Sequence, residues 1–172
     1  LGKDFVLRGY GKLGYGNDLP FYKNFYAGGF GSVRGYDNST LGPKYDSVYA
    51  ENTGLENFDP EEVGGNALVQ FGTELALPLP FKGDWTRQVR PVLFAEGAQV
   101  FDTQCDVPTS EASKQYCKDN FGFELDNMRY SVGVGFTWIT MIGPLSLSYA
   151  YPLNDKDGDE TKNIQFEIGR TF

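Results

Sequence analysis

The chain has 172 residues, with 23 acidic against 15 basic side chains and a net charge of −8. This acidic balance argues against nucleic acid as a partner, because binding to phosphates needs a basic surface. No stretch of about 18 consecutive apolar residues occurs, which excludes a transmembrane helix, and the absence of histidine removes the most common general base and metal ligand.

Six segments alternate between apolar and small or polar residues, which is the pattern of half-buried β-strands. With 22 glycines and an aromatic content of 16%, the composition is typical of an all-β protein rather than a helical bundle. In one segment Val92 and Phe94 depart from the pattern, because they fall on the polar face. The predicted strands lie at about 4–15, 65–79, 87–101, 128–139, 145–153 and 162–172.

Long and short connections alternate along the chain, and most acidic residues lie in the three long ones, 16–63, 102–126 and 154–161. Outer-membrane β-barrels show this asymmetry, with short periplasmic turns and long outer loops. A soluble β-sandwich produces the same alternation within its strands, but it has no reason to keep every long loop at one end. The pattern therefore favours a transmembrane antiparallel β-barrel, with the sandwich as the alternative.

Six strands are too few for a free-standing membrane barrel. Such barrels begin at eight strands, and an open sheet leaves edges that lipid cannot satisfy. Either the chain is part of a larger barrel or several copies close one together. The first residue is leucine and no signal-peptide pattern follows it, so we expect residues 1–172 to be one barrel portion of a longer protein. The isolated chain could cover its edges as a homodimer.

The connection 16–63 contains a glycine-rich segment that ends in Val33-Arg34-Gly35-Tyr36. The glycines before this motif permit backbone conformations that are closed to other residues, so the loop can fold back tightly on itself. An arginine carried into a barrel interior needs a carboxylate partner, because breaking a buried ion pair costs roughly 3–5 kcal/mol. The alternative is an exposed arginine in a flexible loop.

This segment resembles a loop of the outer-membrane protein assembly-factor family. The resemblance covers essentially the whole chain, and it is closer to the assembly factors than to the secretion transporters of the same superfamily. It implies the last six strands of a sixteen-stranded barrel, with a loop that re-enters the lumen. It also implies that Arg34 meets Glu74 and Glu96, two residues on the polar face of their strands. Further matching segments are Leu19-Pro20-Phe21-Tyr22, Gly64-Gly65-Asn66-Ala67 and the terminal Phe172.

The function that the resemblance implies is the folding and insertion of β-barrel proteins into the outer membrane of a Gram-negative bacterium, without ATP. The barrel of such a machine would open between its first and last strands, and the exposed edge would template client strands. The implied partners are unfolded β-barrel clients, membrane lipid with lipopolysaccharide, and accessory lipoproteins bound through periplasmic domains outside this chain. The seam strand and C-terminal signal would comprise Ile164, Phe166, Ile168, Gly169 and Phe172.

Three alternatives stay open. Phe172 could be a simple aromatic of the membrane interface. A secretion transporter of the same superfamily, passing a polypeptide through its lumen, would share the motif of residues 33–36. A plain porin or surface-binding barrel would give no reason for an arginine-bearing loop with two matched lumen acids.

Cys105 and Cys117 lie in one predicted outer loop, and an oxidising periplasm would join them as a disulfide. A metal site is the alternative, but the sequence supplies no further cysteine and no histidine for it. The acidic segment 155–160 lacks the spacing of an EF-hand, so we interpret it as a solvated outer turn. Residues 29–35 lack the context of a nucleotide-binding loop, and no nucleophile lies in a pattern with a base. The sequence therefore predicts no enzyme, no cofactor and no metal.

Overall fold

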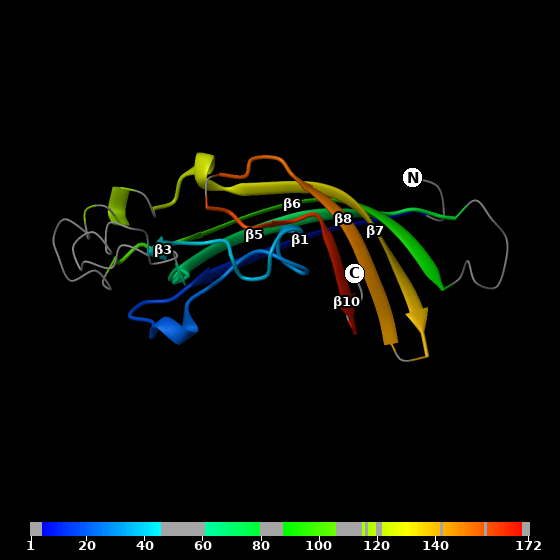
Figure 1. The fold of residues 1–172 in the computed structure, drawn as a ribbon, viewed down its shortest axis with the longest axis horizontal. Coiled ribbons are helices and arrows are strands. Elements are labelled where there is room, and N and C mark those ends of the chain that lie inside the picture. The colour runs from blue at the N-terminus through cyan, green and yellow to red at the C-terminus, as the bar shows by residue number, and fades with distance from the viewer. Residues whose placement is uncertain are drawn as a thin grey trace.

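The computed structural model describes residues 5–45, 61–79, 88–105, 115, 117–119, 122–141, 143–156 and 158–169. Its main feature is a curved, antiparallel, six-stranded sheet in the order β1-β5-β6-β7-β8-β10 (Figure 1). Among the described residues, no helix has the length and apolar character needed to cross a membrane. The strands of the sheet are β1 (Val6–Tyr15), β5 (Ala67–Ala76), β6 (Val89–Phe101), β7 (Arg129–Thr140), β8 (Gly143–Pro152) and β10 (Ile164–Ile168).

Each strand of the sheet overlaps one strand expected from the alternation, but the bounds differ. The connection between the expected strands 128–139 and 145–153 is shorter than expected, because β7 continues to Thr140 and Gly143 and Pro144 already belong to β8. The largest difference concerns the segment 162–172. There β10 spans only Ile164–Ile168, and residues 170–172, Phe172 among them, lie outside the described residues.

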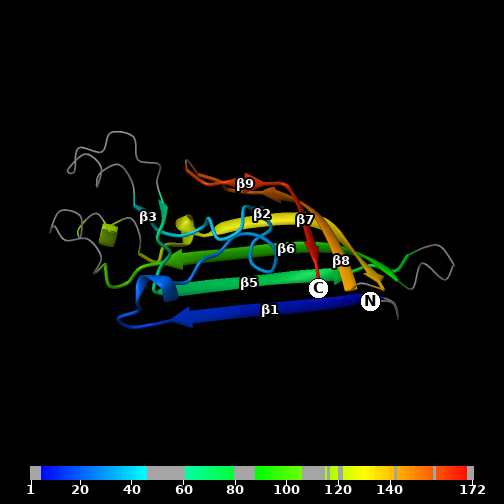
Figure 2. The ribbon, with the colours of Figure 1, turned by 60° about the horizontal axis from the view of Figure 1, so that its bottom comes forward.

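Short elements lie in the connections. They are the 3-10 helices η1 (Phe21–Lys23) and η3 (Leu125–Asn127), and the two-residue strands β2 (Gly35–Tyr36), β3 (Lys44–Tyr45), β4 (Glu61–Glu62) and β9 (Thr161–Lys162). Strand β2 pairs with β9, and β3 pairs with β4. The connections that follow β1, β6 and β8 leave the sheet at one end, whereas those that follow β5 and β7 leave it at the other (Figure 2).

The two faces of the sheet differ in the way that the alternation predicts. One face exposes large apolar side chains to the surroundings, as a lipid-facing surface does. They include Leu7, Leu13, Phe71, Val134, Phe136, Trp138, Tyr149, Ile164, Phe166 and Ile168. The opposite face carries buried polar side chains, including Gln70, Glu74, Glu96, Ser131, Thr137, Ser146, Ser148 and Gln165. A water-soluble sandwich would bury its apolar face instead, so this distribution argues against that alternative.

What buries the polar face is the connection between β1 and β5. We call residues 24–45 the inner loop, because they run across the concave side of the sheet (Figures 1 and 2). A small apolar core forms where the inner loop meets β5 and β6. Its members are Ala27, Val33, Tyr36, Leu41, Leu68, Ala98 and Val100, with Phe25 packed against them.

Candidate functional site

The inner loop is held in a compact fold by its own backbone. Ala27 and Leu41 form an antiparallel bridge between its two arms, and Phe25 bridges to Gly65 at the start of β5. Gly28 lies in the left-handed region at φ +103°, and a Cβ there would stand 2.3 Å from the carbonyl oxygen of Asp37. Glycine is therefore required at this turn, because any side chain would collide with the backbone of the returning arm.

Arg34 lies at the centre of the site and is almost completely buried, with 1% of its surface exposed. Its Nε donates to Oε1 of Glu96 at 2.9 Å, and its Nη2 donates to Oε1 of Glu74 at 2.7 Å and also to Glu96. The backbone N–H of Arg34 donates to the second oxygen of Glu96 at 2.8 Å. We call Arg34, Glu74 and Glu96 the clasp, because these contacts join the inner loop to β5 and β6 at once.

Phe94 is an apolar residue on the polar face of β6, and its contact with Arg34 explains this position. The guanidinium carbon of Arg34 lies 3.5 Å from the centroid of the Phe94 ring. An aromatic face attracts a cation and desolvates the adjacent ion pair. The irregular position of Phe94 in the alternation was the available signal for this role, but a pattern along one strand cannot reveal which side chain will lie over the ring.

Strand β1 adds two groups to the clasp that the sequence did not single out as site residues. The Tyr10 hydroxyl donates to Oε1 of Glu96 at 2.6 Å, and Arg8 Nη1 donates to Oε2 of Glu74 at 3.2 Å. The ion pair of Arg8 is partly open to solvent, with 52% of its side chain exposed, so it contributes less than the buried pairs. Arg8 and Tyr10 occupy even-numbered positions on β1, on the same face as the other polar residue of that strand. This parity was the only signal in the sequence.

Gly35 and Tyr36 continue the inner loop away from the clasp toward the other edge of the sheet. Gly35 has φ +96°, and a Cβ there would contact Cβ of Ala150 at 3.3 Å. Both residues pair with β9, Gly35 opposite Lys162 and Tyr36 opposite Thr161. Val33 and Tyr36 are fully buried. The four residues of the motif thus fill two tasks, with Arg34 in the clasp and its neighbours in packing and strand pairing.

Asp37 follows the motif at the rim of the site. The backbone N–H of Asn38 donates to its carboxylate and holds the pKa of that carboxyl below its ordinary value, and Lys162 lowers it further. The carboxylate of Asp37 is therefore charged at neutral pH. Lys162 Nζ lies 3.3 Å from Asp37 Oδ1, with both side chains substantially exposed.

Two glutamines on the polar face also bind the backbone of the inner loop. Gln70 on β5 donates to the carbonyl oxygen of Gly31 at 3.0 Å, and Gln165 on β10 donates to that of Tyr36 at 2.6 Å. Neither glutamine belongs to a motif that the sequence shows. Each is only a polar residue at a lumen-facing position, and such residues are common in barrel interiors.

The proposed seam residues lie on β10, at one edge of the six-stranded sheet. Ile164, Phe166 and Ile168 point to the exposed apolar face, and within the described residues β10 pairs with β8 alone. Gly169 follows the strand at φ +95°, and its N–H donates to the carbonyl oxygen of Pro144 at 2.8 Å. The strand thus offers one open row of backbone groups in the part of the chain that the structure describes.

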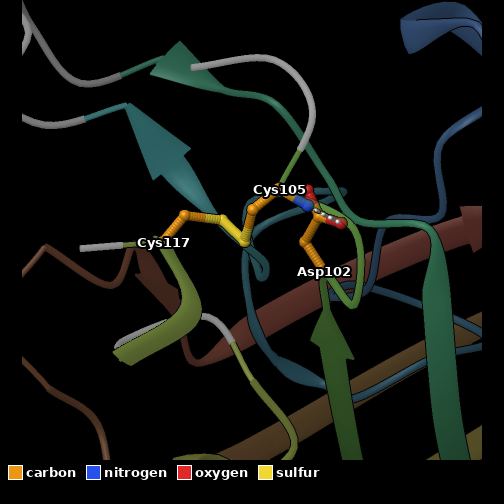
Figure 3. Close-up of side chains that lie close together, drawn as sticks. All are labelled: Asp102, Cys105 and Cys117. Atoms are coloured by element: carbon orange, nitrogen blue, oxygen red, sulfur yellow. Dashed lines mark hydrogen bonds between the residues drawn. A yellow bond between two sulfur atoms is a disulfide. The ribbon is translucent and has the colours of Figure 1, made fainter. Parts of the chain in front are cut away.

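Cys105 and Cys117 form a disulfide with a Cα–Cα distance of 5.8 Å (Figure 3). Asp102 lies close to the two sulfur atoms, but one of its carboxylate oxygens accepts the backbone N–H groups of Gln104 and Cys105. The three residues therefore form a cross-linked turn. The predicted disulfide, rather than the alternative metal site, is the arrangement that the structure shows.

Reduction of this disulfide followed by alkylation is expected to modify both cysteines and to increase protease cleavage between them. A cross-link of this size stabilises the closed loop by roughly 2–4 kcal/mol. Mass spectrometry and limited proteolysis of the membrane-embedded protein check the expectation, with the double variant Cys105→Ser/Cys117→Ser as a control that should not respond to reductant. Alkylation without prior reduction would contradict the assignment.

The described residues of the acidic turn 155–160 are exposed, as expected, except for Asp159. The carboxylate of Asp159 accepts hydrogen bonds from Arg129 through both Nε and Nη2, and it also accepts the backbone N–H of Lys156. Lys156 in turn donates to the side chain of Asn127. These hydrogen bonds tie the turn to the start of β7. The sequence pattern alone could not show this, because it does not reveal that Arg129 lies next to the turn.

Comparison with known proteins places the chain in a family. The Omp85 superfamily domain matches residues 1–172. The chain is 38% identical to the outer membrane protein assembly factor BamA of Neisseria meningitidis, over 100% of this chain and 22% of that protein. It is 26% identical to the human sorting and assembly machinery component 50 homolog, over 86% of this chain and 28% of that protein.

A crystal structure of BamA from Haemophilus ducreyi, lacking POTRA domains 1–3, superposes with a TM-score of 0.77 and 34% identity, over 95% of this chain and 31% of that one. The chain thus spans less than a third of each of these relatives. The resemblance inferred from the motif is confirmed, as is the all-β fold of a barrel portion. On the family match over all 172 residues, the chain belongs to the Omp85 superfamily.

Proposed function

We propose that this chain forms part of the barrel of a machine that folds and inserts β-barrel proteins into the cell outer membrane of a Gram-negative bacterium. The observation that carries the proposal is the 38% identity, over the whole chain, with a protein named as an outer membrane protein assembly factor. The human relative is also named for sorting and assembly. Neither name supports the alternatives of a secretion transporter or a plain porin.

The geometry suggests how each part of the chain would serve this function. The apolar face of the sheet would contact lipid and lipopolysaccharide, while the inner loop would occupy the lumen. The open edge of β10 would offer backbone N–H and C=O groups to a client strand, which would add to the sheet by β-augmentation. An exposed edge is ordinarily an aggregation hazard, but here it would be the working surface.

The chain would act as a template rather than an enzyme. The free energy for insertion would come from the client, whose strands gain backbone hydrogen bonds and lipid contacts as they fold. Accessory lipoproteins would bind through domains of the longer protein. The isolated chain, with two sheet edges to cover, would have no insertase activity of its own and could form a homodimer.

Single cysteines placed along residues 164–168 of the full-length protein test this function. We expect them to cross-link to a stalled, half-folded barrel client in membranes, in the register of two antiparallel strands. A cysteine at Val134, on the lipid-facing side of β7 away from the edge, is the control that should stay unlinked. Cross-links from lumen-facing positions to an extended passenger, with the β10 edge silent, would indicate a secretion transporter instead.

A further inference from the structure

The last strand leaves its neighbour before that neighbour ends. The register of β10 with β8 begins at Ile164 opposite Tyr149, although β8 continues to Pro152. Asn163 still exchanges hydrogen bonds with Ala150, because the Ala150 N–H donates to its carbonyl oxygen at 2.8 Å and its side chain donates to the carbonyl oxygen of Ala150 at 2.9 Å. Beyond this point the chain turns away from β8.

The segment that does not pair with β8 pairs with the inner loop instead. Thr161 and Lys162 pair with Tyr36 and Gly35 in the small sheet β2–β9. The Asp37 N–H extends this ladder by donating to the carbonyl oxygen of Glu160 at 2.8 Å. The outer end of the last strand therefore has a strand partner that belongs to the loop and not to the barrel wall.

Side chains strengthen the same junction. The amide of Gln165 donates to the carbonyl oxygen of Tyr36 at 2.6 Å, and Gln165 itself is buried. Lys44 Nζ, further along the loop, donates to the carbonyl oxygen of Gly158 at 2.8 Å. Because the Gln165 side chain starts on β10 and ends on β2, it sets the distance between the last strand and the loop at the point where the pairing changes over.

The clasp and this junction are consecutive in the chain but engage distant parts of the sheet. Arg34 holds β5 and β6 through Glu74 and Glu96, whereas the next two residues hold β9. Strands β6 and β10 are separated in the sheet by β7 and β8. A displacement of Arg34 from the clasp would therefore pull directly on the pairing of the last strand.

We propose that Gln165 is a positioning residue, and that the inner loop holds the outer end of the last strand in place for as long as the clasp is closed. When the loop withdraws, the backbone groups of Lys162 and the carbonyl oxygen of Glu160 lose their partners on Gly35 and Asp37 and must then pair with water, with β8 or with another strand. The state of the clasp thereby sets how much of the last strand is free to pair. The inference rests on the proposed seam function of β10.

Amide hydrogen exchange of the full-length protein in lipid bilayers tests the coupling. Gln165→Met keeps the length of the side chain but removes its donor, and Arg34→Lys weakens the clasp while keeping the charge. Each variant is expected to accelerate exchange of the Lys162 N–H, which faces Gly35 in the ladder, by roughly fivefold or more, since one hydrogen bond is worth about 1 kcal/mol. Acceleration by Arg34→Lys is the decisive result, because no described contact joins the Arg34 side chain to Lys162.

The matched control is Gln70→Met. Gln70 is buried like Gln165 and also donates to a carbonyl oxygen of the inner loop, but it does so on the opposite side of Arg34 and on a strand remote from β10. With the clasp intact, we expect it to leave exchange at Lys162 unchanged. If Arg34→Lys accelerates exchange at Ala27 and Leu41, which bond to each other within the loop, but not at Lys162, the loop and the last strand merely touch, and the inference is wrong.

Client folding by the same preparations separates this inference from the proposed function. If the unmodified protein folds no client, the proposed function is wrong, and so is the seam on which the inference rests. If the unmodified protein folds clients, but hydrogen exchange at Lys162 does not change when the clasp is weakened, only the proposed coupling is wrong.

Discussion

Replacing Arg34 with alanine is expected to destabilise the folded barrel by about 3–5 kcal/mol, since it removes one member of a buried ion cluster. Glu74 and Glu96 would remain buried, and their described partners would be the side chains of Arg8 and Tyr10 and the backbone N–H of residue 34. The free energy of unfolding of the full-length protein, followed by urea titration in detergent or bilayers, measures the loss. The inner loop should also become accessible to protease.

Two further substitutions sharpen this prediction. Arg34→Lys should give an intermediate loss, because an ammonium group cannot match the fork that reaches both carboxylates. Lys12→Ala removes a cation from an exposed position on the same lumen face and should change stability by no more than about 0.5 kcal/mol. If Arg34→Ala were as mild as Lys12→Ala, the interpretation of an exposed arginine in a flexible loop would be correct.

Gly28→Ala is the second substitution with a large expected effect. A non-glycine residue in the left-handed region costs roughly 1–3 kcal/mol, and the added Cβ would also overlap the carbonyl oxygen of Asp37, 2.3 Å away. Relieving that overlap must separate the two arms of the inner loop, which adds roughly 1–3 kcal/mol. We therefore expect a lower thermal midpoint and faster hydrogen exchange across residues 27–41.

Gly158→Ala is its matched control. Gly158 has φ +87°, close to the value at Gly28, but a Cβ there would meet nothing within 4 Å. It should show the cost of the backbone conformation alone. Equal thermal midpoints for the two variants would mean that the close approach of the two arms contributes nothing to stability.

Much of the sheet was predictable because the information is local. Successive side chains of a strand point to opposite faces, so the alternation in 128–139 identifies both a strand and its lipid-facing side before any partner is known. The same parity places Glu74 and Glu96 on the lumen face. The strand ends were less accurate, because Gly143 and Pro144 are turn formers by composition and yet continue β8.

The resemblance implied Glu74 and Glu96 as the partners of Arg34, and the structure brings the three together. The other contacts of the site were harder to predict, because they depend on register and on the path of the loop. Tyr10 reaches Glu96 across 86 residues of sequence, and Gln165 reaches Tyr36 across 129. In the sequence, Phe94 is only an irregularity in the alternation of β6. The structure explains it, because Arg34 lies over the Phe94 ring. In the acidic turn, charge alone could not distinguish a solvated Asp159 from one paired with Arg129.

The amino-acid sequence by itself determined the all-β class, the face that each strand turns to lipid and the need of Arg34 for a carboxylate. These follow from the period of the strand and from the cost of a buried unpaired charge. Only the tertiary structure decided that the inner loop, which Arg34 holds on β5 and β6, pairs with β9 through the next two residues. That choice depends on strand register and backbone path across the whole sheet, which no short segment of the chain encodes.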